Sequence, residues 1–312
     1  MHAVMSVPFL VGGALWLTGA RLGRRLPPAT AVRLLSVGAV VVASSTGFVL
    51  AVVAFTVLAQ IPAVATLGHW SATMVAGGDP VPVSAGVLAG GIVIVLLAAA
   101  LRRSALAARD LAAAAVACHR LGPGVAGLVI IDDEAPEAYT LPGLSGRVVV
   151  STAMLRALPA DERRVLLAHE AAHLRHHHHL YVQLAELGAA ANPMLGPLAG
   201  AVRDGVERWA DEDAALEVGD RTIAARALAR AGLARAHSTA SRRPALPAAL
   251  AAVETGIAHR ALALLAPRPG RQRWLTAAVA AVILAPLVTS AITARDTEHR
   301  FEVAQAAYSS PR

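Results

Sequence analysis

Four stretches of this chain are apolar and long enough to cross a membrane as helices, which limits the possible folds more than any other feature. About 20 consecutive apolar residues span the hydrocarbon layer of a bilayer. Hydrophobic residues make up 56% of the sequence and the mean hydropathy is +0.55, both too high for a typical soluble domain. The sequence therefore predicts a multi-pass membrane protein. The expected spans are residues 4–20, 34–60, 81–101 and 274–294.

The distribution of arginine predicts how the spans are oriented. The chain contains no lysine, and the loop of residues 61–80 has no basic residue, whereas arginines follow the first and third spans and precede the fourth. Basic loops stay in the cytoplasm, so we expect the amino terminus outside the cell and the region between the third and fourth spans in the cytoplasm. Three arginines after the last span are an exception. No small-residue cleavage site follows the first span, which is expected to remain as an anchor.

The net charge of +7 does not indicate a partner among the nucleic acids. Much of the arginine lies beside the apolar spans, and no stripe of basic and aromatic residues is present. Anionic lipid of the bilayer is the better partner for these arginines. Cys118 is the single cysteine, so no internal disulfide can form, which fits a reducing compartment.

The segment HEAAH, residues 169–173, predicts half of a zinc site. Residues four apart share one face of a helix, so His169 and His173 can direct two imidazole nitrogens at one metal ion while Glu170 lies beside them. Zinc then needs a third protein ligand and an open position for water. The alternative, in which the two histidines only pair with surface carboxylates, stays open.

A third ligand is expected from a neighbouring element, and residues 203–211 offer one. Glu207 and Asp211 lie one turn apart there, so Glu207 can bind the metal while Asp211 accepts a hydrogen bond from a ligating histidine. Arg203, four residues before Glu207, is expected either to steady it through an ion pair or to form an ordinary exposed pair of small value.

These motifs resemble those of integral-membrane gluzincin metallopeptidases. HEAAH, followed by E-x-x-A-D at residues 207–211 with Arg203 one turn earlier, is most similar to the beta-lactam-sensor (BlaR/MecR) peptidase family. The HtpX-type membrane proteases are the second choice. The resemblance covers residues 127–265 in motif order. It implies an endopeptidase with one catalytic Zn²⁺, in which Glu170 is the base for the water that attacks the peptide bond.

The same resemblance implies a protein or peptide substrate, namely a cytoplasmic transcriptional repressor or the protease itself. An extended substrate would lie beside a strand that contains Ala138 and Tyr139, although Tyr139 can equally be a packing aromatic. Related enzymes add a donor that stabilises the oxyanion, and His237, His259 and Tyr139 are the candidates. Only residues 295–312 follow the last span, whereas the sensors carry a large external domain there, which places drug sensing in doubt.

The expected fold class is mainly α, with about four transmembrane helices and a gluzincin-like α+β domain that contains a small sheet. We expect a membrane domain at residues 1–104, a cytoplasmic metallopeptidase domain at residues 105–270, and the last span with a short tail at residues 271–312. Apolar runs bounded by turn residues predict strands within residues 127–133 and 146–151.

Residues 180–202 are apolar and long enough for a further span, but a zinc site excludes that crossing. It would put His173 and Glu207 on opposite sides of a layer about 30 Å thick, whereas zinc ligands lie about 2 Å from the metal. We therefore expect a broken helical hairpin that packs on the membrane surface or dips partway into it. A helix over residues 211–236 and a loop over 238–247 should follow.

Two other functions remain in competition. One is a membrane signalling protein whose zinc fold has lost catalysis and serves for docking; the complete ligand set with Glu170 argues against it. The other is a metal transporter or sensor built on the histidines of residues 176–179. It would need charged or metal-binding residues inside the spans, and residues 34–60 and 81–101 contain none. The histidine run is expected to be a solvated or headgroup-facing surface, with His177 as a weaker candidate ligand.

Overall fold

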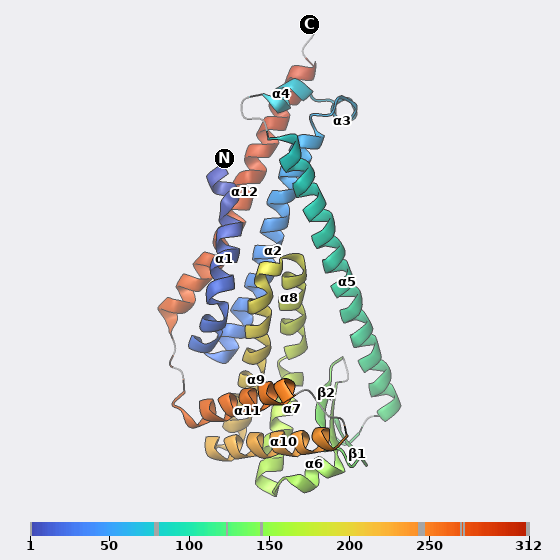
Figure 1. Cartoon of the computed structure of the whole chain (residues 1–312), viewed down its shortest axis with the longest axis vertical. Helices are drawn as coiled ribbons and strands as arrows, with labels where there is room; N and C mark the ends of the chain where they lie inside the picture. Colours follow the sequence, from blue (N-terminus) through green and yellow to red (C-terminus); the bar gives the residue numbers. More distant parts are fainter. Residues whose placement is uncertain are drawn as a thin grey trace.

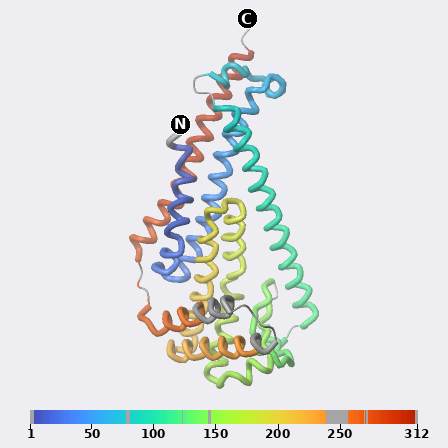
Figure 2. The backbone as a smooth tube through the Cα atoms, in the orientation of Figure 1, coloured from blue at the N-terminus to red at the C-terminus, as the bar shows by residue number. Residues whose placement is uncertain are grey.

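The computed structural model describes residues 2–77, 81–122, 124–143, 146–242, 247–268, 270 and 272–309. Within these residues, four helices are long and apolar enough to cross a membrane, as the predicted fold class requires (Figure 1). They are α1 (His2–Arg25), α2 (Pro28–Leu58), α5 (Val83–Leu121) and α12 (Arg273–Ser309). Helix α1 begins and α12 ends at the end of the molecule away from the sheet (Figure 2).

Two of the four helices extend well beyond their apolar parts. Helix α5 is continuous through the segment after residue 103, and its last turns reach the end of the molecule that carries the sheet (Figure 1). Helix α12 continues through residues 295–309, where Phe301 packs against Phe55 and Trp70 with ring centroids 5.3 and 5.1 Å apart. The polar tail is thus a helical extension that packs against the short helix α4 (Ala72–Ala76), which follows another short helix, α3 (Pro62–Gly68).

The hairpin expected over residues 180–202 is present and enters the helix bundle. It consists of α8 (His178–Ala191), the 3₁₀ turn η1 (Pro193–Leu195) and the first part of α9 (Gly196–Val218). Both helices pack along α2, and the tip lies between the long helices (Figure 1). At the tip, the buried Asn192 accepts from the N–H of Met194 and donates to Thr46 of α2 over 3.3 Å. The hairpin therefore enters and leaves the helix bundle at the same end, the one that carries the sheet.

A three-stranded sheet lies beside the lower end of this bundle. Strands β1 (Leu128–Ile131) and β3 (Arg147–Ser151) correspond to the two predicted strands, and they pair in parallel. Strand β2 (Ala138–Leu141) pairs antiparallel with β3, so the order in the sheet is β1-β3-β2. The N–H of Ser151 donates to the carbonyl of Glu137 over 2.9 Å. Because outward and inward pairs alternate along an antiparallel ladder, the backbone groups of Ala138 and Thr140 point away from β3. Strand β2 is thus an edge strand of the sheet, with these backbone groups facing outward.

Helices α6 (Thr152–Ala157), α7 (Ala160–Arg175), α10 (Arg221–Arg242) and α11 (Pro247–Leu265) complete the end that carries the sheet (Figure 1). The prediction of a single helix over residues 211–236 is wrong, because α9 ends at Val218 and α10 begins at Arg221. Gly219 adopts φ +81°, which ends α9, and the carboxylate of Asp220 accepts the N–H groups of Thr222 and Ile223 at the start of α10. The expected loop begins later, because α10 continues to Arg242; residues 243–246 lie outside the described residues.

Candidate metal centre

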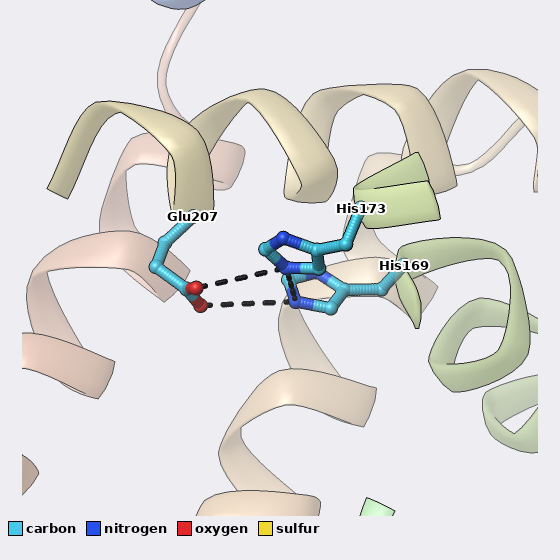
Figure 3. Close-up of side chains that lie close together, drawn as sticks. All are labelled: His169, His173 and Glu207. Atoms are coloured by element: carbon cyan, nitrogen blue, oxygen red, sulfur yellow. Dashed lines mark hydrogen bonds and ion pairs between the residues drawn. The ribbon is translucent and has the colours of Figure 1, made fainter. Parts of the chain in front are cut away.

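Two histidines of α7 and one glutamate of α9 meet at a single point. The Nε2 atoms of His169 and His173 are 3.2 Å apart, as one helical turn between them requires. Glu207 faces both rings, with its oxygens 3.7 Å from Nε2 of His169 and 3.6 Å from Nε2 of His173 (Figure 3). All three side chains are partly exposed, so a further ligand can reach this point.

The spacing of these atoms fits a tetrahedral metal ion. Ligand bonds of about 2.0–2.2 Å at tetrahedral angles separate neighbouring ligand atoms by about 3.3–3.6 Å. The two Nε2 atoms, 3.2 Å apart, lie close to this range, and each of them has a different oxygen of Glu207 near it, at 3.7 Å for His169 and 3.6 Å for His173. Two imidazoles and one carboxylate leave a fourth position open, which is the donor set of a catalytic metal site rather than a closed structural one.

Asp211, one turn after Glu207, fixes the ring of His169. Its Oδ1 atom is 3.0 Å from Nδ1 of His169, so Nε2 is left to bind a metal. Burial alone would raise the pKa of Asp211, but hydrogen bonds from Arg260 and His169 outweigh it and lower the pKa to about 2. Asp211 is therefore a carboxylate at neutral pH and accepts the Nδ1–H of His169.

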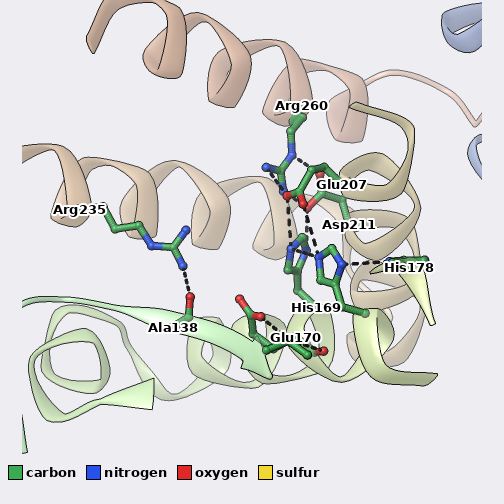
Figure 4. A network of polar contacts seen from close by, with 10 residues as sticks. Ala138, His169, Glu170, His178, Glu207, Asp211, Arg235 and Arg260 are labelled. Atoms are coloured by element: carbon green, nitrogen blue, oxygen red, sulfur yellow. Dashed lines mark hydrogen bonds and ion pairs between the residues drawn. The ribbon is translucent and has the colours of Figure 1, made fainter. Parts of the chain in front are cut away.

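Arg260 of α11, which the sequence does not single out, contacts the carboxylates of both Glu207 and Asp211 on α9. Its guanidinium donates to the two oxygens of Asp211, each over 2.8 Å, and its Nη1 lies 2.8 Å from an oxygen of Glu207 (Figure 4). Arginine suits this fork-shaped contact because its donors are planar and always charged. The sequence holds no local signal for this contact, because Arg260 is about fifty residues after its partners.

The histidine run after α7 is not the solvated surface that the sequence suggested. His178 is 1% exposed, and its Nδ1 lies 3.0 Å from Nδ1 of His173. His176 contacts Asp213 over 2.5 Å and stacks on Trp209 at 4.5 Å. His177 is exposed and forms the turn between α7 and α8 with φ +51°, so it lies outside the cluster of ligands.

Glu170 lies on α7 next to the first ligand and faces the edge strand. It is 7% exposed, and the hydroxyl of Thr140 donates to its Oε2 over 2.7 Å. The same hydroxyl lies 3.2 Å from the backbone carbonyl of Glu170. Strand β2 therefore fixes the carboxylate of Glu170 beside the candidate metal ligands.

The remaining predicted site residues lie farther from the centre. Arg203 pairs with Glu186 of α8 over 2.9 Å and not with Glu207, as one of the two expectations had it. The arginine that pairs with Glu207 is Arg260. Tyr139 is 39% exposed and lines the cleft, whereas His237 and His259 are exposed and are not among the described residues that line it.

A cleft of about 470 Å³ joins the metal ligands, the edge strand and helices α8, α10 and α11. One part of it is polar and contains the three ligand residues, Glu170 and Asp211. The other part is apolar, between α7, α10 and α11. Its described apolar lining includes Val165, Leu166, Ala224, Ala227, Leu228, Ala231, Ile257 and Leu264.

An HExxH helix that meets a glutamate of a second helix, beside the edge strand of a small sheet, defines a metallopeptidase site. Comparison with family models agrees: the model of peptidase family M48 matches residues 100–266, which is more than half of the chain. The chain therefore belongs to peptidase family M48. No curated protein and no solved structure matches it. The family membership supports the metallopeptidase class; the finer choice between the BlaR/MecR type and the HtpX type stays a prediction.

Proposed function

We propose that this protein is a zinc-dependent endopeptidase, anchored in the cell membrane, that cleaves protein substrates at its cytoplasmic face in regulatory proteolysis. The observation that carries the proposal is the meeting of His169, His173 and Glu207 from two helices, with Glu170 held beside them by Thr140. Family membership adds that the site is metal-dependent.

His169, His173 and Glu207 would hold the zinc ion. When bound, the ion polarises the scissile carbonyl and acidifies the attacking water. Glu170 takes a proton from that water and delivers it to the nitrogen of the leaving amine. Thr140 orients the carboxylate for both transfers, while Asp211 fixes the tautomer of His169.

The edge strand β2 offers the substrate a place to bind. An extended peptide can add itself as a further strand there, because the backbone groups of Ala138 and Thr140 point away from β3. A substrate side chain would then enter the apolar part of the cleft. Such binding requires a locally extended segment of substrate, which a flexible or unfolded region supplies.

The orientation and the kind of substrate rest on the sequence. Arginines beside the spans favour an external amino terminus and a cytoplasmic site. The motif resemblance favours the BlaR/MecR type, in which the substrate is a repressor or the protease itself, with the HtpX type as second choice. A comparison of new protein amino termini in cells with active or inactive protein identifies the substrate and separates these types.

The deciding experiment compares the purified wild type with Glu170→Gln. The substitution keeps the size of the side chain and removes its basicity, so peptide hydrolysis should fall by about 10²- to 10⁴-fold while bound zinc stays unchanged. Equal hydrolysis by the two proteins, with equal zinc content, would remove Glu170 as the base. Normal downstream signalling by Glu170→Gln in cells would favour the inactive docking protein instead.

A further inference from the structure

The two histidines at the centre are held by different partners on their far nitrogens. Nδ1 of His169 faces the carboxylate of Asp211, which is the usual partner of a metal-bound histidine. Nδ1 of His173 instead faces Nδ1 of His178 over 3.0 Å (Figure 4). Because His178 is the first residue of α8, the start of the bundle hairpin lies directly against the candidate ligand.

The proton positions follow from the proposed role of His173. If its Nε2 binds a metal, the proton of the neutral ring must be on Nδ1, which then needs an acceptor. Nδ1 of His178 is in the right place to accept, and its own proton is then on Nε2. That Nε2 atom is buried and has no hydrogen-bond partner among the described residues. A buried polar atom without a partner destabilises the fold, so packing alone gives no reason for a histidine here.

The charge of the site explains why the partner of His173 is neutral. A divalent ion and Arg260 carry three positive charges, and Glu170, Glu207 and Asp211 carry three negative ones, so the site has no net charge. A second aspartate beside His173 would add an uncompensated buried charge. An imidazole fixes the tautomer without that cost.

The ring of His178 is held firmly on its other sides. It packs against Trp209 and His176, with ring centroids 4.8 and 5.6 Å away. Arg33 at the start of α2 lies 4.8 Å above the ring of Trp209. The acceptor therefore sits in a rigid aromatic cluster at the junction of the membrane bundle and the site, which is where a positioning group is most effective.

We propose that His178 is a positioning residue that fixes His173 for metal binding by accepting its Nδ1–H. This inference rests on the proposed metallopeptidase function, and it assigns the two ligands unlike supports: a charged one for His169 and an uncharged one for His173. It also gives one member of the histidine run a defined role.

Zinc affinity tests the assignment without any measurement of activity. Full-length wild type, His178→Leu and His178→Asn are purified, freed of metal with a chelator, and titrated with Zn²⁺ against a competing chelator. Leucine fills the space but cannot accept a hydrogen bond, so the dissociation constant should rise by about 10- to 100-fold. The Oδ1 atom of asparagine can take the place of Nδ1 of histidine, so His178→Asn should remain within about threefold of the wild type.

His177→Asn is the matched control, because it makes the same change one residue earlier at an exposed position where asparagine tolerates positive φ. It should bind Zn²⁺ as the wild type does. The visible absorption of the Co²⁺ forms should separate His178→Leu from the other three proteins. His178→Ala replaces His178→Leu if the latter does not fold.

The outcomes separate this inference from the proposed function. A wild type that binds no Zn²⁺ overturns the proposed function. A wild type that binds Zn²⁺ with the same affinity as His178→Leu overturns only the role of His178. Equal weakening by His178→Leu and His178→Asn also overturns it, because the accepted hydrogen bond would then be irrelevant and only the shape of the imidazole would matter.

Discussion

At the scale of single residues, the hydroxyl of Thr140 connects the edge strand to Glu170, the proposed base. It belongs to the edge strand, yet it donates to the carboxylate of Glu170 over 2.7 Å. A carboxylate that must take a proton and release it again needs a fixed direction, and Glu170 is buried apart from its face toward the cleft. One hydrogen bond therefore connects the strand that would bind a peptide to the group that would act on it.

Replacing Thr140 by valine should reduce catalysis and leave metal binding intact. Valine keeps the shape of threonine but removes the donor to Glu170, and a hydrogen bond to a charged group contributes enough for a decrease of about tenfold or more in kcat. Thr140→Ser keeps the hydroxyl and should retain most of the activity. Kinetics with a fluorescent peptide and measurement of bound zinc check both. An unchanged kcat for Thr140→Val would show that the bond does not orient Glu170.

The site residues differ in how far the sequence could predict them, because their contacts depend on structure of different range. The pair His169 and His173 follows from the period of one helix, which is local. Glu207 and Asp211 share such a spacing on a second helix, so the motif indicates them too. Arg260 reaches the site only because α11 packs back over α9, and no local pattern encodes that packing. The run of four histidines predicts a solvated surface, but the left-handed turn at His177 directs His178 into the interior. The sequence pattern does not encode that turn.

At the scale of elements, the hairpin of α8 and α9 sets the distance between the candidate metal ligands. Helix α8 begins at the histidine cluster and α9 carries Glu207, so the packing of both against α2 places the third ligand opposite α7. The turn chemistry of residues 192–197 predicted the hairpin, and the need to keep His173 and Glu207 together excluded a crossing. A glycine break at Gly219 was missed, because a single glycine inside an amphipathic pattern is compatible with a continuous helix.

Gly188→Ala should displace α8 from α2. A Cβ atom at Gly188 would lie 2.8 Å from the backbone of Ala39, where neither chain has room to move without separating the helices. We expect a loss of about 1–3 kcal/mol in stability and weaker zinc binding. Gly47→Ala on α2 is the control, since a Cβ there meets nothing within 4 Å. Thermal unfolding in detergent measures both, and equal stability of the two variants would contradict close packing at Gly188.

Arg235 of helix α10 contacts strand β2 at the edge where we propose that a peptide binds. Arg235 donates to the carbonyl of Ala138 over 2.8 Å, and this carbonyl is one of the groups that a bound peptide would use. Arg235→Ala should therefore lower KM by about three- to tenfold, with little change in kcat. Arg226→Ala, an exposed change on the same helix, should have no effect. A higher KM for Arg235→Ala would mean that the arginine binds substrate itself.

At the scale of the whole molecule, the four long helices lie between two ends, one with the sheet and the candidate metal centre and one with the short helices α3 and α4. The sheet and helices α7, α10 and α11 lie at one end, and α1 begins and α12 ends toward the other (Figure 1). The position of the spans could be predicted from apolar length, since a bilayer requires that length whatever the packing. Their orientation rests on arginine alone, which calls for a direct test.

The single cysteine of the chain supplies that test. Cys118 lies near the end of α5 beside the sheet and is partly exposed. If the site faces the cytoplasm, a membrane-impermeant thiol reagent should leave Cys118 unlabelled in intact cells and label it after permeabilisation. A second variant reverses the expectation: Thr73→Cys combined with Cys118→Ser moves the thiol to α4 at the opposite end, where intact cells should be labelled. If intact cells label the wild type at Cys118 and leave the double variant unlabelled, the site lies outside, and substrates would have to be sought there. Because the pair reports opposite ends of one molecule, unequal access of the reagent cannot imitate either result.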